Sequence, residues 1–242
     1  MIDLRQVNKI FGRLQALDQV DLKFEAGKSY AMIGPNGSGK TTLIKCILGM
    51  VIPTSGEIFV DNENIRNHWH YRKKIGYMPQ IGRYPDNMRI GQLFDMMKNI
   101  RSAENNFDEE LVREFQLSKI FDKRMHALSG GTRQKVSAAL ALLFHAPIMI
   151  LDEPTAGLDP VSVEILKEKI LREKSNGKLF VISSHILSDL DELSSEIVYL
   201  FEGKVQYNDS IAALKAETQE ERLGKAIAVY INHNSLQHNL QE

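Results

Sequence analysis

The sequence lacks several features that would point to a secreted, membrane-spanning or nucleic-acid-binding protein. A single cysteine among 242 residues excludes an intramolecular disulfide and fits a reducing compartment. The 30 basic and 31 acidic residues nearly cancel, so no basic excess would attract nucleic acid, and no nucleic-acid partner is expected. The longest purely apolar run, Ala138 to Phe144, is far shorter than the roughly 18 residues of a membrane helix.

The start of the chain, MIDLRQVNKIF, alternates apolar and polar residues and has no basic end followed by an apolar core, so no secretory signal is expected. These absences together predict a cytoplasmic globular protein. If it acts at a membrane, we expect another chain to supply the span.

The patterns that are present are typical of an α/β fold. Alternating apolar residues within 2–7 and 20–24 predict two strands of a partly exposed antiparallel sheet. Short strands are also predicted at 29–33, 57–60, 75–78, 148–151 and 179–183. Three of these, at 29–33, 148–151 and 179–183, are continuous apolar runs, which is typical of strands covered on both faces. The stretch 161–174, between the last two of them, has helical spacing.

Residues 87–145 contain no convincing strand and are predicted to be helical throughout, as an inserted lobe. We therefore expect one main domain over 1–208, with a core (1–80 and 146–208), a helical lobe (81–145), and a short C-terminal extension (209–242). The extension begins with an amphipathic stretch and ends in a polar tail. This pattern leaves open whether it is a regulatory tail or a frayed end.

A phosphate-binding loop is indicated by the segment GPNGSGKTT, which satisfies G-x-x-x-x-G-K-[ST] between an apolar strand and a helix expected at 41–50. Its glycines allow a tight turn that points backbone N–H groups inward, at the positive end of the helix. Lys40 is expected to neutralise the β and γ phosphates, and Thr41 to offer its hydroxyl to Mg²⁺. The predicted nucleotide-binding residues here are Gly34, Pro35, Asn36, Gly37, Ser38, Gly39, Lys40, Thr41 and Thr42.

Two adjacent carboxylates, Asp152 and Glu153, follow a predicted buried strand, at the sheet edge where α/β proteins bind ligands. Asp152 is expected to hold Mg²⁺ through its water shell, and Glu153 to orient and polarise the water that attacks the γ phosphate. A strand-ending Asp-Glu pair alone could equally be structural, because turns favour acidic residues. The phosphate loop favours the catalytic interpretation. The predicted fold class is then an α/β P-loop NTPase core with a mixed sheet, an antiparallel β subdomain and an inserted α-helical subdomain.

A third motif, HALSGGTRQK at 126–135, places Ser-Gly-Gly at the start of a predicted helix, where backbone N–H groups can bind an anion. With this motif in place, the sequence resembles the ATP-binding subunits of ABC transporters over residues 1–208. Thr132 stands where the family's LSGGQ has glutamine, and a modest effect on ATP affinity or rate is expected. The resemblance implies a head-to-tail homodimer formed on ATP, in which Ser129, Gly130 and Gly131 of one subunit complete the phosphate site of the other.

The resemblance also implies roles for four residues that would carry little weight alone. Gln80 would reach Mg²⁺ and the attacking water, and His185 would contact the γ phosphate. Asp159 would cross the dimer interface to the partner's phosphate loop. Phe11 would stack on adenine, where the family more often has tyrosine. The implied catalytic residues are Glu153, His185 and Gln80, and the implied Mg²⁺ ligands are Thr41, Gln80 and Asp152.

The function implied by the resemblance is ATP hydrolysis that powers a separate membrane permease, contacted through the lobe around 81–100 at the inner face of the cell membrane. The segment TAGLDPVS resembles subunits paired with ABC-2 type permeases, which are mostly exporters, with an importer as the weaker alternative. The competing class is a soluble ABC-type ATPase of translation or DNA repair, which usually has two ATPase cores or a long coiled coil. A kinase or G protein would leave the Ser-Gly-Gly motif without a role. The transported substrate stays open.

Overall fold

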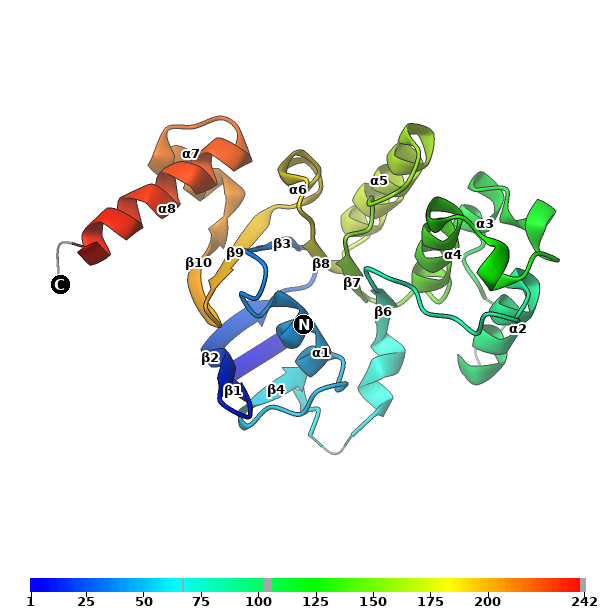
Figure 1. The fold of residues 1–242 in the computed structure, drawn as a ribbon, viewed down its shortest axis with the longest axis horizontal. Coiled ribbons are helices and arrows are strands. Elements are labelled where there is room, and N and C mark those ends of the chain that lie inside the picture. Colours follow the sequence, from blue (N-terminus) through cyan, green and yellow to red (C-terminus); the bar gives the residue numbers. More distant parts are fainter. Residues whose placement is uncertain (67, 102–105, 240–242) are drawn as a thin grey trace.

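The computed structural model describes residues 1–66, 68–101 and 106–239. For residues 234–239 it describes the backbone alone. Its strands form two sheets (Figure 1). The antiparallel sheet has the order β2-β1-β4-β5, with β1 Ile2–Phe11, β2 Leu14–Phe24, β4 Ser55–Val60 and β5 Glu63–Asn64. The second sheet has the order β10-β9-β3-β8-β7-β6, with β3 Ser29–Ile33, β6 Ile75–Met78, β7 Ile148–Asp152, β8 Leu179–Ser183, β9 Glu196–Phe201 and β10 Lys204–Ser210.

The second sheet is mixed, as predicted. Strands β9, β3, β8, β7 and β6 run parallel, and β10 pairs antiparallel with β9. Every residue of β3, β7 and β8 is buried, which confirms the strands covered on both faces. The sequence interpretation missed β5, β9 and β10. Strand β9 has an apolar run like that of the other buried strands, whereas β10 is mostly polar.

The helices cover the mixed sheet and form a separate lobe beside it (Figure 1). The α-helices are α1 Lys40–Ile47, α2 Ile90–Arg101, α3 Glu110–Glu114, α4 Gly130–Leu142, α5 Pro160–Ser175, α6 Leu187–Leu193, α7 Ile211–Thr218 and α8 Leu223–Asn239. Short 3₁₀ helices are η1 His70–Lys74, η2 Leu117–Ile120 and η3 Met125–Ala127. Helix α1 ends earlier than expected, because Gly49 adopts a left-handed φ of 66°. A Cβ at Gly49 would lie 2.5 Å from the Tyr71 hydroxyl, so glycine is needed there.

The lobe is less regular than the prediction of a helical stretch throughout. Helices α2, α3 and α4 are separated by turns and by η2 and η3, and Gln116 ends the turn after α3 with a left-handed φ of 52°. Arg89 also forms an isolated antiparallel bridge with Arg124. Part of the predicted lobe, 102–105, lies outside the described residues. A period of 3.6 identifies the buried faces of such a segment but does not place the turns between its short helices.

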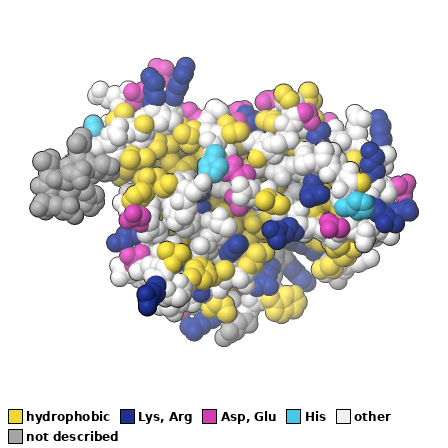
Figure 2. All heavy atoms as spheres, viewed as in Figure 1, with side chains coloured by type: hydrophobic (Ala, Val, Ile, Leu, Met, Phe, Trp, Pro, Cys, Tyr) yellow, Lys and Arg dark blue, Asp and Glu magenta, His cyan; other side chains and the backbone are white. Residues whose placement is uncertain are grey.

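Two apolar clusters hold the layers together, one on each face of the mixed sheet. In β7, Ile148 and Ile150 pack with the antiparallel sheet and α1, and Met149 and Leu151 pack with α4, α5, α6 and the lobe. Successive residues of β7 point to opposite faces of the sheet and both faces are covered, so the strand is apolar at every one of these positions. Basic and acidic side chains are both spread over the face shown in Figure 2, in keeping with their nearly equal counts.

The C-terminal extension packs on the core and is not frayed over the residues whose side chains are described. Ser210 accepts a hydrogen bond from the N–H of Ala213 over 3.0 Å and so caps α7. Leu214 in α7 and Ile227 in α8 are buried in the same apolar cluster as the sheet. Tyr207 of β10 meets Tyr230 of α8 edge to face, with ring centroids 4.8 Å apart. Helices α7 and α8 therefore form a hairpin against α6 and β10 (Figure 1).

Candidate functional site

The loop between β3 and α1 has the backbone shape that its glycines predict. Gly34, Gly37 and Gly39 have φ values of 148°, 81° and 106°, a range that L residues rarely adopt. A Cβ at Gly34 would lie 2.1 Å from the Leu200 carbonyl oxygen, and one at Gly39 would lie 2.6 Å from the Ala16 carbonyl oxygen. The loop thus fits tightly against β9 and β2, and its amides lead into the N-terminus of α1.

Lys40 is held by this loop. Its Nζ donates hydrogen bonds to the carbonyl oxygens of Gly34 and Pro35, over 2.6 and 3.0 Å. Burial lowers the pKa of Lys40, and the nearby charges of Glu153 and Asp152 oppose that shift. A partly buried cation beside open backbone amides is an arrangement suited to polyphosphate.

The two carboxylates at the end of β7 are held differently. Asp152 accepts a hydrogen bond from the Ser183 hydroxyl of the neighbouring strand. Glu153 has a left-handed φ of 54°, and its N–H donates to the Ser183 carbonyl oxygen over 2.9 Å. Its Oε2 accepts from the backbone N–H of His185 over 3.2 Å, and its Oε1 lies 3.5 Å from His185 Nε2. The left-handed turn at Glu153 brings its carboxylate beside His185, which follows the neighbouring strand β8.

These groups line one cavity of about 350 Å³, within the usual range for small-molecule sites. Twelve of the predicted site residues line it, namely Phe11, Asn36, Gly37, Ser38, Gly39, Lys40, Thr41, Thr42, Gln80, Asp152, Glu153 and His185. Gly34 and Pro35 belong to the same loop but are not among the lining residues. Phe11 is 46% exposed at the rim, and the neighbouring Leu14 and Ala16 also line the cavity. Leu14 was missed, because the sequence does not show that the start of β2 lies beside the phosphate loop.

The predicted residues Ser129, Gly130, Gly131 and Asp159 do not line this cavity. Ser129 caps α4, accepting a hydrogen bond from the Thr132 N–H over 3.2 Å. A Cβ at Gly131 would lie 2.6 Å from the Gly157 carbonyl oxygen, so the helix start packs closely on the loop that follows Glu153.

Two contacts fasten the start of α4 to that loop. Gln134 Nε2 donates to the Glu153 carbonyl oxygen over 2.9 Å, and Lys135 Nζ lies 2.6 Å from Asp159 Oδ2. The hydrogen bond from Lys135 holds the pKa of Asp159 well below its ordinary value. The sequence interpretation gave no role to Gln134, Lys135 or Ser183. Their roles depend on which elements become neighbours in the fold.

Comparisons with known proteins identify the family of this chain. The family model for ABC transporter matches residues 17–156. The chain is 32% identical over 207 residues to the lantibiotic transport ATP-binding protein SrtF of Streptococcus pyogenes, covering 85% of this chain and 89% of that protein. A solved ATP-binding subunit of an ABC transporter has a TM-score of 0.88 at 24% identity, over 94% of this chain and 98% of that chain. A dimeric ATP-binding cassette in a post-hydrolysis state, with ADP and phosphate, has a TM-score of 0.75 at 26% identity, over 87% of this chain and 98% of that chain.

The fold and the phosphate loop define a P-loop ATPase. The chain belongs to the ABC transporter family, as an ATP-binding subunit that hydrolyses ATP. Within the part of the chain that the structure describes, no helix combines the length and apolar character of a membrane span.

Proposed function

We propose that two copies of this chain bind two ATP molecules head to tail and hydrolyse them to power a separate membrane permease. The observation that carries the proposal is the position of Ser129. It is exposed at the start of α4, outside the cavity that contains Lys40 and Glu153 of the same chain. The first N–H groups of a helix favour phosphate, so the phosphate that Ser129, Gly130 and Gly131 would contact is the one bound by the partner subunit.

Within each site, the backbone amides of 34–39 and Lys40 hold the β and γ phosphates, and the Phe11 ring stacks on adenine. Thr41, Gln80 and Asp152 line the same cavity and offer a hydroxyl, an amide and a carboxylate. These are the hard oxygen donors that Mg²⁺ takes together with phosphate oxygens and water, so the residues present fit this metal. When bound, Mg²⁺ neutralises charge on the transferring phosphoryl group.

The water that attacks the γ phosphate is oriented by Glu153 in this proposal, with Gln80 beside it. The carboxylate is held by the backbone N–H of His185. The His185 side chain is exposed and lines the cavity, where it contacts the γ phosphate in this proposal. Asp159 reaches the partner's phosphate loop when the dimer closes. Until then its carboxylate is held by Lys135 and by the Ser162 N–H at the N-terminus of α5.

The permease is proposed to bind the lobe around 81–100 at the inner face of the cell membrane. Ile81 and Ile100 support this surface, because they are 65% and 66% exposed and apolar. The resemblance of TAGLDPVS to ATP-binding subunits paired with ABC-2 type permeases favours an exporter over an importer.

Gel filtration tests the dimer. Glu153→Gln with ATP and Mg²⁺ is expected to elute as a dimer, and as a monomer with ADP. A variant that stays monomeric with ATP would contradict the proposal.

For the permease, affinity purification from native membranes is expected to recover a polytopic protein with the wild-type chain. Recovery of ribosomes or DNA instead would favour the soluble class.

A further inference from the structure

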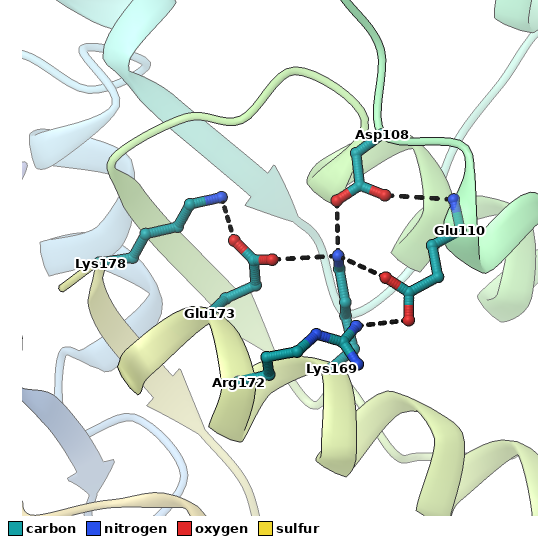
Figure 3. Close-up of polar contacts among 6 residues, drawn as sticks. All are labelled: Asp108, Glu110, Lys169, Arg172, Glu173 and Lys178. Atoms are coloured by element: carbon teal, nitrogen blue, oxygen red, sulfur yellow. Dashed lines mark hydrogen bonds and ion pairs between the residues drawn. The ribbon is translucent and has the colours of Figure 1, made fainter. Parts of the chain in front are cut away.

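A second set of charged residues lies away from the ATP site, where the helical lobe meets α5 (Figure 3). It contains three basic and three acidic side chains, namely Lys169, Arg172, Lys178, Asp108, Glu110 and Glu173. The charges balance, so the cluster needs no outside ion. Nothing in the proposed ATPase cycle uses it.

Lys169 is the centre of this cluster. Its side chain is 3% exposed, and its Nζ lies 2.5 Å from Asp108 Oδ2, 2.9 Å from Glu110 Oε2 and 3.0 Å from Glu173 Oε1. The ammonium group has three donors, and each has a carboxylate partner. Glu110 also pairs with Arg172, and Glu173 with Lys178.

The contacts of Lys169 cross from the core into the lobe. Glu173 is one turn further along α5, whereas Asp108 and Glu110 belong to the start of α3. Asp108 is itself fixed in the lobe, because its Oδ1 accepts from the Glu110 N–H over 3.1 Å and its own N–H donates to the Leu143 carbonyl oxygen over 2.9 Å. Leu143 follows the last residue of α4, whose first turn carries Ser129.

Helix α5 is therefore joined to the lobe by charged contacts at two places. One is the pair Lys135–Asp159 at the start of α5, and the other is Lys169 with Asp108 and Glu110, about 15 Å further along the helix axis. The side chains of the first pair are 23% and 49% exposed, while those of Lys169 and Asp108 are 3% and 10% exposed. The exposed pair can exchange with water, and the buried one cannot without stranding a charge.

We propose that Lys169 is a positioning residue that fixes the angle of the helical lobe on the core and thereby sets where Ser129 meets the partner's ATP. This inference rests on the proposed head-to-tail site. Lys169 is the fixed joint between α5 and the lobe. The Lys135–Asp159 pair is more exposed and adds less to this restraint. A buried ion cluster suits this role, since it specifies one geometry more than it adds stability.

The chain offers a matched comparison for the test. Asp108→Asn with Glu110→Gln removes the two carboxylates on the lobe side and keeps their shapes, and the amide oxygen at 108 can still accept from the Glu110 N–H. Glu173→Gln removes a carboxylate at a similar distance from the same Nζ, but within α5. Turnover, ATP affinity of the single chain and the midpoint of thermal unfolding are measured for both.

The lobe-side double variant is expected mainly to lose turnover, and Glu173→Gln is expected mainly to lose stability. The lobe-side double variant should lose about tenfold in kcat with ATP affinity within about twofold of wild type, because misplacing a group by a fraction of an ångström is costly in catalysis. Glu173→Gln should keep kcat within about twofold but unfold at a lower temperature than wild type, since its carboxylate is 9% exposed and pairs with both Lys169 and Lys178. Equal kcat values for the two variants, or kcat losses that follow the losses of stability, would overturn the inference.

Ser129→Ala separates this inference from the proposed function. If Ser129→Ala turns over like wild type, the shared site itself is wrong. If Ser129→Ala is inactive and the lobe-side variant keeps full turnover, only the role of Lys169 is wrong. Should the double variant not fold, Glu110→Gln alone carries the comparison, with an expected loss of at least about threefold in kcat.

Discussion

The carboxylate of Glu153 accepts a hydrogen bond from the backbone N–H of His185, over 3.2 Å. Two residues from the ends of neighbouring parallel strands are thereby joined inside the cavity that holds the phosphate loop. The contact fixes one oxygen of Glu153 and leaves the other, 3.5 Å from His185 Nε2, toward the cavity.

This geometry predicts that Glu153→Gln separates ATP binding from hydrolysis. The amide oxygen can still accept from the His185 N–H, so the loop should keep its shape, but the side chain can no longer accept the proton of the attacking water. Turnover should fall by about 10²- to 10³-fold, while the Kd for ATP stays within about twofold of wild type. Phosphate release and equilibrium binding measure the two quantities. A turnover near that of wild type would remove Glu153 from its role.

Adenine stacking on Phe11 gives a second prediction. Phe11→Ala should weaken ATP binding by about 1–2 kcal/mol, or roughly five- to thirtyfold in Kd, through loss of the ring face. Phe11→Tyr keeps the ring and should bind ATP within about twofold of wild type. Equal Kd values for the alanine variant and the wild type would show that adenine binds elsewhere. Because Phe11 is 46% exposed, thermal unfolding should change little in either variant.

The Lys169 cluster should make stability sensitive to acid. Burial opposes ionisation of Asp108 and Glu110, but hydrogen bonds from Lys169 outweigh it, and the pKa of each carboxyl lies below its ordinary value of 3.8 or 4.5. A carboxyl with a depressed folded pKa adds stability above its unfolded pKa, and that stability is lost as the pH falls through the folded value. The pKa of Lys169 is raised, so the lysine stays charged throughout.

The wild type should therefore exceed the Asp108→Asn, Glu110→Gln variant in unfolding free energy at pH 6, and the difference should shrink below about pH 4.5. Urea unfolding at pH 6, 5, 4 and 3 measures it. A difference that is constant over this range would mean that the charges of these two carboxylates do not stabilise the fold.

The C-terminal hairpin is expected to unfold with the core. Leu214 is 2% exposed and packs in the same cluster as the mixed sheet, so Leu214→Ala should lower the unfolding free energy by about 2–4 kcal/mol. Ile52→Ala is the control, because Ile52 is 75% exposed and its loss should cost less than about 0.5 kcal/mol. Equal stability of the two variants would show that α7 and α8 are not part of the cooperative unit.

Much of the site could be predicted from sequence because its parts are local. The phosphate loop is one continuous segment, and Asp152 and Glu153 directly end an apolar strand. Ser183 could not be predicted as the partner of Asp152, because the contact depends on β7 and β8 becoming neighbours. The contact of Gln134 with the Glu153 carbonyl oxygen could not be predicted either, because it depends on α4 packing against the loop after β7.

Lys169 shows the limit most clearly. A lysine in an amphipathic helix is normally a solvent-facing residue, and two of the three carboxylates that neutralise Lys169 are 59 and 61 positions away in the sequence. The turns of the lobe and strand β10 were missed for a related reason. Their sequences are largely polar, so they lack the apolar pattern that identified the other elements.

The central claim is that each ATP site is shared between two subunits. Ser129→Ala and Lys40→Ala spoil opposite halves of a shared site, so a mixed dimer contains one site with both halves intact. Steady-state ATP turnover of an equal mixture of the two chains is expected to rise to about a quarter of the wild-type rate, whereas each variant alone is nearly inactive. Turnover of the mixture no higher than the mean of the two separate variants would contradict the account.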